Sequence, residues 1–252
     1  GGGLVGISVA YGLSQRRVDN VVLDEGDGAI RASRGNFGLV WVQGKGLALP
    51  AYTGWAMRAV EQWPELAERL RSETGIDVGL TQRGGLYLSR TPEAFAQRAQ
   101  DLAAVKSRFR GNYDFDMLDN EAIRKRVPEI GPDVVGGSYS PYDGQANPLR
   151  LLHALHRGYL LRGGRVLSGG GVTDIDQRGD KFVLTTATGQ VIANRIVLAA
   201  GLGNAGLGQM LGVTIPVKPI RGQILVTERM PPMIENLLRE AQAPMKIAYE
   251  PI

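Results

Sequence analysis

The pattern of apolar and polar residues at the start of the chain predicts a helix followed by a short strand. Residues 4–16 carry apolar side chains at helical spacing, with small residues that allow close packing. Residues 21–23 form an uninterrupted apolar run, as expected for a strand in a parallel sheet covered on both faces. Such a helix and strand are part of a βαβ unit. We therefore expect another apolar strand before residue 1, and a chain that is a fragment of a longer protein.

The middle of the chain predicts helices around one strand. Residues 31–46 are punctuated by glycines and lack a regular period, which predicts a loop. Residues 50–74 show helical spacing that places Trp55 and Trp63 in the core, while Pro64 predicts a break or a new first turn. The remaining elements of this region are expected at 84–89 (strand), 92–109 (helix, capped by Thr91) and 120–127 (helix, capped by Asp119).

From residue 147 onward, strands dominate the pattern. Asn147-Pro148 predicts the start of a helix, and Gly163-Gly164 predicts its end. The later elements are expected at 165–167 (a buried strand), 172–177, 181–187 and 190–193 (a meander), 195–201 and 217–227 (strands) and 233–240 (a helix). Strand–helix elements thus flank a middle of different character. This order predicts an α/β sheet assembled from two separated segments, with another domain inserted between them.

The first six residues form a G-x-G-x-x-G pattern, and an acidic residue ends the following strand. Gly1 allows a tight turn, Gly3 lets a pyrophosphate approach the backbone, and Gly6 lets the helix pack closely on its strand. The N–H groups of the helix N-terminus face the phosphates, and the Asp24 carboxylate accepts ribose hydroxyls. The pattern indicates a dinucleotide site. Because 35 of the 252 residues are glycine, a glycine-rich loop that opens an ordinary helix stays the alternative.

Composition and charge exclude several classes of function. With 43% hydrophobic and 21% charged residues, the chain is typical of a globular domain. The net charge is +4, but the basic residues at 106–110 and 124–126 are not interleaved with exposed aromatic residues. We therefore expect solvated helix faces there and no nucleic-acid partner. No apolar run reaches the roughly 18 residues of a transmembrane helix, and no signal peptide is visible.

The chain contains no cysteine and only two histidines. Disulfides, thiolate metal sites and a cysteine nucleophile are therefore excluded for these 252 residues. The absence of cysteine fits a cytoplasmic location, with attachment to the inner membrane face left open. His153 and His156 lie on one predicted helix, but the sequence supplies no further converging ligands. We expect both to be surface or packing residues, and no metal.

Short motifs follow one another along nearly the whole chain. They are Gly1–Gly6, Leu23-Asp24-Glu25-Gly26, Ala32-Ser33, Asp143-Gly144 before Asn147-Pro148, Val172, Val197-Leu198-Ala199-Ala200-Gly201 and Pro219-Ile220-Arg221-Gly222-Gln223. Together they resemble the D-amino-acid oxidase (DAO) family of FAD-dependent oxidoreductases. The loop at 34–41 is similar to the glycine-oxidase-like or opine-oxidase-B-like branch of that family.

The resemblance implies a discontinuous fold. A split Rossmann-like FAD-binding domain, with a parallel sheet and a β-meander, is expected at 1–45 and 141–215. An inserted α+β substrate or cap domain on an antiparallel sheet is expected at 46–140 and 216–252, and it would be incomplete.

The resemblance also implies a set of cofactor contacts, with FAD bound non-covalently. The expected residues are Gly1, Gly3, Leu4, Val5 and Gly6 at the pyrophosphate turn, Asp24 and Glu25 at the ribose, Ala32 and Ser33 at the phosphates, Asn36, Phe37, Gly38 and Leu39 beside the flavin ring, Val172 at the adenine, and Ala200 and Gly201 along the cofactor. A simple turn or cap role stays open for the side chains of Ser33 and Asn36.

Substrate contacts are expected at Trp41 and Tyr249, with a core role as the alternative for Tyr249. The catalytic residues stay unidentified, because the family's clamp for the substrate carboxylate falls beyond residue 252. The resemblance implies oxidation of the C–N bond of an amine or amino acid (glycine, a D-amino acid, an N-alkyl amino acid or an opine). Hydride would pass to the flavin, and the resulting imine would be hydrolysed.

Three alternatives to this function stay open. The first is a flavin-binding subunit of a hetero-oligomeric dehydrogenase that has no activity on its own. The second is an NAD(P)-dependent Rossmann dehydrogenase, which shares the glycine fingerprint but does not need the later motifs. The third is a Rossmann-like domain without cofactor. Homo- and hetero-oligomers are both compatible with the sequence, and either oxygen or an electron carrier would reoxidise the flavin.

Overall fold

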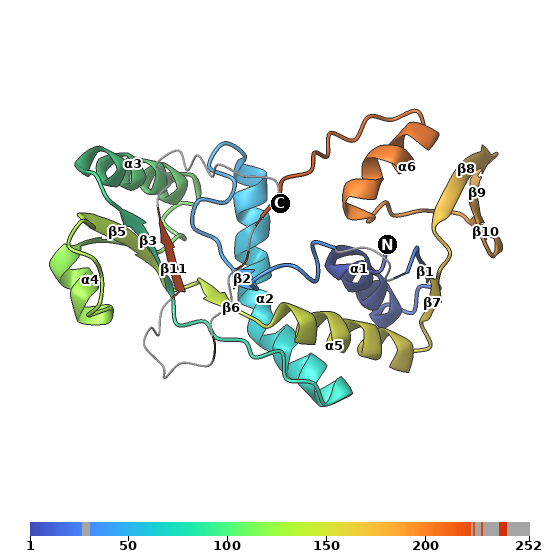
Figure 1. The fold of residues 1–252 in the computed structure, drawn as a ribbon, viewed down its shortest axis with the longest axis horizontal. Helices are drawn as coiled ribbons and strands as arrows, with labels where there is room; N and C mark the ends of the chain where they lie inside the picture. The colour runs from blue at the N-terminus through green and yellow to red at the C-terminus, as the bar shows by residue number, and fades with distance from the viewer. Residues whose placement is uncertain (27–30, 223, 225–227, 229–236, 241–252) are drawn as a thin grey trace. The chain divides into compact units, whose positions relative to one another are not determined.

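The computed structural model describes residues 1–26, 31–222, 224, 228 and 237–240. The chain divides into two compact units, each built from separated stretches of sequence (Figure 1). Unit 1 comprises residues 1–38, 66–79 and 147–226, and unit 2 comprises residues 39–65, 80–146 and 227–252. Residues 66–79 thus belong to unit 1, although the expected boundary at residue 46 would place them in the inserted domain.

Two helices and a pair of parallel strands form the centre of unit 1. The elements are α1 (Leu4–Gln15), β1 (Val21–Asp24), α5 (Pro148–Leu161) and β7 (Arg165–Ser168). β1 pairs with β7 in parallel, and α1 packs against α5 (Figure 1). Gly158 permits this close packing, because a Cβ there would lie 2.9 Å from the Tyr11 ring. Elements far apart in sequence therefore assemble into one α/β layer.

A three-stranded antiparallel meander follows β7 in unit 1. Its strands are β8 (Val172–Arg178), β9 (Lys181–Thr186) and β10 (Gly189–Ala193), in the order β10-β9-β8. The chain then passes through residues 194–200 into the short helix η1 (Gly201–Gly203) and helix α6 (Asn204–Met210). The predicted meander is present at its expected position.

Unit 2 holds a four-stranded sheet with the strand order β11-β3-β5-β4. The strands are β3 (Gly85–Ser89), β4 (Asp116–Asp119), β5 (Gly136–Ser140) and β11 (Leu237–Glu240), and the helices that follow β3 and β4 are α3 (Pro92–Arg108) and α4 (Asn120–Arg126). The hydroxyl of Thr91 and the carboxylate of Asp119 accept N–H groups of the first turns of α3 and α4, as predicted. A separate antiparallel pair joins β2 (Leu39–Val40) to β6 (Gly144–Gln145).

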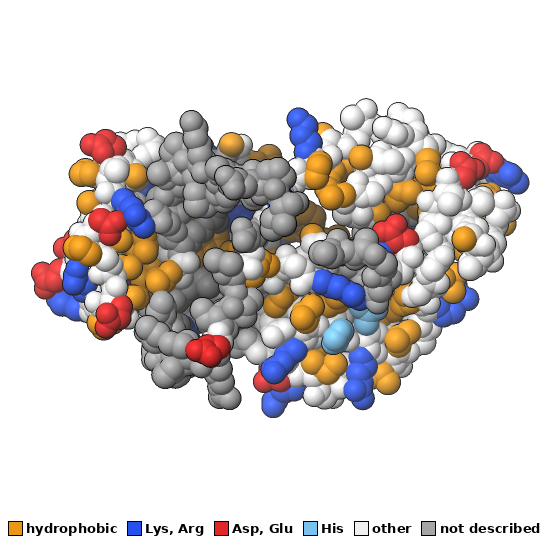
Figure 2. Space-filling model, viewed as in Figure 1, with side chains coloured by type: hydrophobic (Ala, Val, Ile, Leu, Met, Phe, Trp, Pro, Cys, Tyr) orange, Lys and Arg blue, Asp and Glu red, His pale blue; other side chains and the backbone are white. Residues whose placement is uncertain are grey.

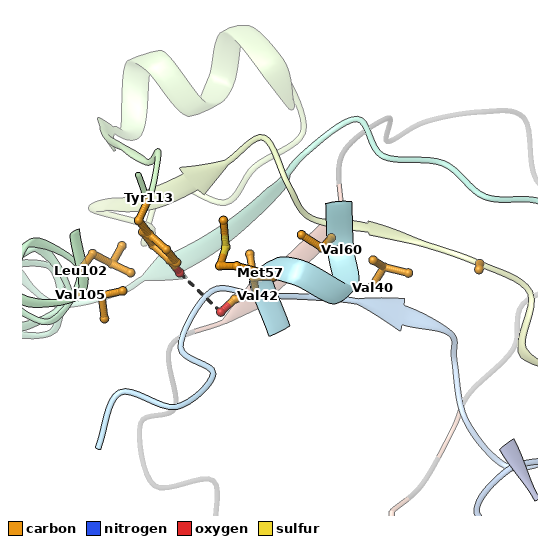
Figure 3. Packing of buried hydrophobic residues seen from close by; sticks show 8 residues of the cluster. Val40, Val42, Met57, Val60, Leu102, Val105 and Tyr113 are labelled. Atoms are coloured by element: carbon orange, nitrogen blue, oxygen red, sulfur yellow. Dashed lines mark hydrogen bonds between the residues drawn. The ribbon is translucent and has the colours of Figure 1, made fainter. Parts of the chain in front are cut away.

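The largest described core of unit 2 lies between helix α2 (Pro50–Thr74), α3 and the residues around β2. Its buried members are Val40, Val42, Met57, Val60, Leu102, Val105, Tyr113 and Ala146 (Figure 3). The Tyr113 hydroxyl donates to the Val42 carbonyl oxygen over 3.4 Å, so the ring is buried without leaving its polar atom unpaired. This core fixes the chain immediately after β2.

Three predicted elements of the C-terminal part are wrong in the described residues. Residues 195–200 form no strand there; their backbone lies beside Gly1 without joining a ladder. Residues 217–222 are not a strand either. The helix predicted at 233–240 is wrong over 237–240, where β11 pairs in parallel with β3, and residues 233–236 lie outside the described part. Pairing with a neighbour overrides local propensity in such short segments.

The environment of helix α2 also differs from the prediction. Trp55 is 69% exposed, whereas Trp63 packs against the core of unit 2. The helix continues through Pro64, which cannot donate to the Val60 carbonyl. Gln82 Nε2 donates to that oxygen instead, over 3.3 Å, so the helix continues without a break. Helical spacing therefore located the helix and the core position of Trp63, but it misplaced Trp55.

Two smaller corrections concern strands. β7 is present, but its residues are exposed or half-buried and not buried as predicted. The loop expected at 31–46 contains the two-residue strand β2. In the described residues, no helix is both long and apolar enough to cross a membrane.

Candidate cofactor site

The glycine turn, residues 1–3, enters α1 in unit 1 under tight steric limits. A Cβ on Gly1 would lie 2.5 Å from the Ala199 carbonyl oxygen, and a Cβ on Gly6 would overlap the Gly1 carbonyl oxygen. Real Cβ atoms do not approach backbone oxygens so closely, so these positions require glycine. The predicted roles of Gly1 in a tight turn and Gly6 in close packing agree with this geometry. Ala199 and Ala200, from the third stretch of unit 1, lie against the turn.

The N-terminus of α1 presents backbone N–H groups that have no partner within the helix. Gly3 occupies the N-cap position and offers no side-chain acceptor, and the first turn contains no acidic residue. The N–H of Leu4 donates to the Ser33 hydroxyl over 2.9 Å, and a Cβ on Gly3 would lie 2.8 Å from that same oxygen. A helix N-terminus of this kind stabilises an anion through its N–H groups and its dipole. Val5 is exposed and Ser33 is half-buried at this end of the helix.

Asp24, at the end of β1, holds the turn through its carboxylate. Its Oδ2 accepts the N–H of Gly2 at 2.6 Å and Arg31 Nη1 at 3.1 Å, and its Oδ1 accepts the N–H of Gly26 at 2.9 Å. Burial alone would raise the pKa of Asp24, but these backbone N–H groups and the Arg31 charge hold the pKa below its ordinary value. The carboxylate is therefore ionised at neutral pH, as an acceptor of ribose hydroxyls must be.

The third stretch of unit 1, residues 147–226, reaches the backbone at Asp24 just after β7. The Gly170 N–H donates to the Asp24 carbonyl oxygen over 3.1 Å, and a Cβ on Gly171 would lie 3.1 Å from the Glu25 Cβ. Val172 begins β8 directly after this glycine run. Val172, the predicted adenine-side residue, thus directly follows the two glycines that lie against Asp24 and Glu25.

The loop after Ser33 is stabilised by Asn36. Its Nδ2 donates to the Ser33 carbonyl oxygen at 3.1 Å, and its Oδ1 accepts the Gly38 N–H at 2.9 Å. Gly38 has a φ of +76°, a conformation that favours glycine. Phe37 is 65% exposed, and Ala32 is also exposed. The turn role of the Asn36 side chain is therefore seen directly.

The predicted substrate contacts fall outside this cluster. Trp41 is buried in unit 2 and donates its indole N–H to the Gln43 carbonyl oxygen at 2.6 Å. Leu39, the last predicted flavin-side residue, begins β2 in the same unit. Tyr249 lies outside the described residues. Gly201, at the start of η1, has a φ of +57°.

A buried polar network surrounds Trp41 in unit 2. Asp143 accepts the Val42 N–H and the Gln43 amide, each at 2.7 Å, and Gln43 Oε1 accepts Arg98 Nη2 at 3.2 Å. Gln43 therefore bridges a buried cation and a buried anion. Burial raises the pKa of Asp143 to about 6, although the hydrogen bonds from Val42 and Gln43 and the charge of Arg98 act in the opposite direction.

Two residues of the site had no role assigned to them from the sequence. His156 Nε2 lies 2.8 Å from the Gly2 carbonyl oxygen, so this nitrogen carries the proton and α5 holds the glycine turn directly. The same histidine lines an open, largely apolar groove with His153, Leu160 and Leu161, and histidine side chains reach the surface in Figure 2. The second residue is Arg31. No spacing rule pointed to either residue. His156 contacts a segment that is distant in sequence, and Arg31 lies outside the recognised motifs.

These features fit a dinucleotide that carries a negative diphosphate. The glycine turn leaves no room for side chains, α1 offers donors to an anion, and Asp24 offers an ionised acceptor for ribose hydroxyls. Arg31 Nε is buried and lacks a hydrogen-bond partner in the part of the chain that the structure describes. The Arg31 guanidinium therefore has an unused donor beside Asp24. The described residues contain no cluster of three or more histidine or acidic side chains that could hold a metal.

The α/β fold and the glycine turn, in a unit built from separated stretches of sequence, are typical of dinucleotide-binding proteins. The sequence model of the family described as "FAD dependent oxidoreductase" (DAO) matches residues 1–249. The chain therefore belongs to the DAO family of FAD-dependent oxidoreductases, as its motifs predicted, and FAD is the cofactor of that family.

Curated relatives and solved structures agree with this assignment. The opine oxidase B subunit of Rhizobium meliloti is 43% identical over 230 residues, which cover 91% of this chain and 62% of the relative. The opine oxidase B subunit of Agrobacterium tumefaciens (strain Ach5) is 42% identical over the same shares of both chains. The crystal structure of glycine oxidase from Geobacillus kaustophilus superposes with a TM-score of 0.75 at 29% identity, covering 84% of this chain and 56% of that one. The chain thus spans under two thirds of the length of these relatives, and the predicted fold class is confirmed.

Proposed function

We propose that the protein oxidises the C–N bond of an amine or amino acid, with an opine-type substrate (an N-substituted amino acid) as the first candidate. The observation that carries this proposal is the glycine turn in unit 1, which Asp24, Ser33 and the backbone at Ala199 surround in the way a dinucleotide requires. The opine class is supported by the two relatives that are named as B subunits of opine oxidase.

Within this proposal, unit 1 is the FAD-binding domain and unit 2 is the substrate or cap domain. Asp24 accepts the ribose hydroxyls, and the N-terminus of α1, with Ser33, binds the diphosphate. The bound flavin supplies a hydride acceptor for the carbon beside the substrate nitrogen. The resemblance assigns residues 37–39 to the flavin ring and Trp41 and Tyr249 to the substrate. His156 holds the Gly2 carbonyl toward α5, so that this oxygen does not face the phosphates.

The experiment is an anaerobic substrate titration of the purified full-length protein, followed by visible absorption. Opines, glycine, N-methylglycine and D- and L-amino acids are added separately. Bleaching of the oxidised-flavin spectrum by opines, with weaker or no bleaching by the other compounds, supports the proposal. Bleaching only by glycine or by D-amino acids would make that compound class, and not the opines, the substrate. Failure to acquire any flavin spectrum after FAD is supplied would overturn the cofactor assignment itself.

A second candidate function is a flavin-binding subunit that is active only in a hetero-oligomer. It is favoured by the word "subunit" in the names of the two opine oxidase relatives. Co-expression with the neighbouring open reading frames of the source genome tests it. The hetero-oligomer predicts that flavin is present in the isolated protein but bleaches only in the co-expressed complex, whereas bleaching of the isolated protein would exclude it.

A further inference from the structure

Arg31 occupies an unusual position beside Asp24 in unit 1. Its Nη1 lies 3.1 Å from Asp24 Oδ2, its Nη2 lies 3.1 Å from Glu25 Oε1, and it also donates to the Gly26 carbonyl oxygen. Its Nε is buried and has no hydrogen-bond partner among the described residues. A buried donor without a partner is costly, so these contacts leave part of the donor capacity of Arg31 unused.

The carboxylate of Asp24 is nearly saturated by the same contacts. Its two oxygens offer about four lone-pair positions. Three are used, by the N–H of Gly2, the N–H of Gly26 and the Arg31 guanidinium. A ribose with two adjacent hydroxyls needs two acceptor positions on this group, so one existing donor must leave. The two backbone donors belong to the turns that build the site, which makes Arg31 the donor that can be displaced.

A bound diphosphate would offer a displaced Arg31 a second anionic partner. It lies two residues before Ser33, whose hydroxyl accepts the Leu4 N–H at the N-terminus of α1. A diphosphate is stabilised at that helix end, and the planar guanidinium fork matches phosphate oxygens in pairs. The Arg31 side chain is 23% exposed, so it is not locked in place by packing.

We propose that Arg31 exchanges partners when FAD binds. In the cofactor-free protein it neutralises Asp24, and in the complex it leaves Asp24 to the ribose and donates to the diphosphate, with Nε among its donors. This inference rests on the proposed use of the glycine turn for FAD. Arg31 is then a cofactor-binding residue that also neutralises the ribose-binding carboxylate of Asp24 before FAD binds.

Two fragments of the cofactor separate the two roles of Arg31. ADP carries both the ribose and the diphosphate, whereas adenosine carries the ribose alone. For adenosine, displacing Arg31 from Asp24 brings no compensating contact. For ADP, the lost ion pair is replaced by charge-assisted hydrogen bonds to phosphate. Removing the guanidinium should therefore weaken ADP binding without weakening adenosine binding.

The test uses apoprotein of the full-length wild type, Arg31→Gln and the control Arg16→Gln. Arg16 is exposed and caps the opposite end of α1, so the control removes the same charge away from the site. Dissociation constants of FAD are measured by flavin fluorescence quenching, and those of ADP and adenosine by competition with FAD. Arg31→Gln is expected to weaken FAD and ADP by about tenfold or more, with adenosine unchanged or tighter and with a weaker salt dependence for ADP. The control is expected to change none of these values.

Several results would overturn the inference. An equal loss for ADP and adenosine would mean that Arg31 only maintains the shape of the site, and unchanged ADP binding would mean that it does not reach the phosphates. Arg31→Lys keeps the charge without the fork and is expected to recover part of the ADP affinity, which keeps the test decisive if Arg31→Gln folds poorly. If wild-type apoprotein binds neither FAD nor ADP, the proposed function fails together with the inference. Normal FAD binding by the wild type and by Arg31→Gln overturns the inference alone.

Discussion

Asp143 is expected to make the folded protein more stable in mild acid than at neutral pH. It is fully buried in unit 2, where it accepts hydrogen bonds from Val42 and Gln43 and reaches the Arg98 cation only through Gln43. The decisive perturbation is Asp143→Asn, which keeps the size of the side chain and removes its titration. Arg98 and Gln43 stay in place, so the comparison isolates the carboxyl group.

The magnitude follows from the shift of the Asp143 pKa, from 3.8 to about 6. A folded-state pKa above the unfolded value means that the protonated carboxyl favours the folded state, so this stability is full below the unfolded pKa and is lost as the pH rises through the folded pKa. The full difference is about 3 kcal/mol, since one pKa unit corresponds to about 1.4 kcal/mol. Between pH 7 and pH 5 the wild type should gain about 1.4 kcal/mol from this group.

The assay is urea unfolding of the full-length wild type and Asp143→Asn at pH 7, 6 and 5, followed by tryptophan fluorescence. Asn also changes the hydrogen bonds at this position, because its amide nitrogen would face a donor. That cost does not depend on pH. The difference in unfolding free energy between wild type and variant should therefore grow in favour of the wild type as the pH falls. A difference that stays constant from pH 7 to pH 5 would refute the reasoning, and so would one that changes in the opposite direction.

Three further substitutions probe the cofactor site and the helix that supports it. Gly6→Ala is expected to abolish FAD retention, because its Cβ would overlap the Gly1 carbonyl oxygen; a wild-type ratio of flavin to protein absorbance in the purified variant would contradict this. Asp24→Ala is expected to raise the FAD dissociation constant by about tenfold or more, as measured by fluorescence quenching, and an unchanged constant would refute the ribose assignment. Asn147→Ala is expected to lower the unfolding free energy by about 1 kcal/mol, because Asn147 Oδ1 accepts the first N–H groups of α5. Chemical denaturation measures this free energy, and a loss of only a few tenths of a kcal/mol or less would speak against the cap.

The sequence predicted the parts of the site that depend on local geometry. Gly1 and Gly6 were identifiable because a tight turn and close packing impose glycine at fixed spacing, and Asn147 because a cap acts within one helical turn. Arg31 and His156 were assigned no role at the site. Arg31 forms an ion pair with Asp24 from a loop, and His156 contacts a carbonyl oxygen in a distant segment of the chain. Neither contact leaves a periodic signal in the sequence.

The errors have a similar physical origin. Residues 195–200 are apolar enough for a strand, but a strand also needs a neighbour to pair with, which the pattern of one segment does not specify. Trp55 follows the helical spacing of its neighbours and yet faces solvent, since the buried side of α2 is chosen by what packs against it. Pro64 is tolerated because Gln82, from a later segment, supplies the missing donor.

The pairing of β1 with β7 has a consequence for the order of events on the ribosome. β1 ends at Asp24, but the strand that pairs with it ends only at Ser168, and Ala199 reaches the glycine turn later still. At a synthesis rate of about 5–20 residues per second, roughly 7–30 s separate the emergence of the two strands. During this interval the apolar side of α1, including Ile7 and Tyr11, has no α5 to cover it. The nascent chain therefore offers chaperones an apolar target at α1, and the glycine turn is fully enclosed only after Ala199 has left the exit tunnel.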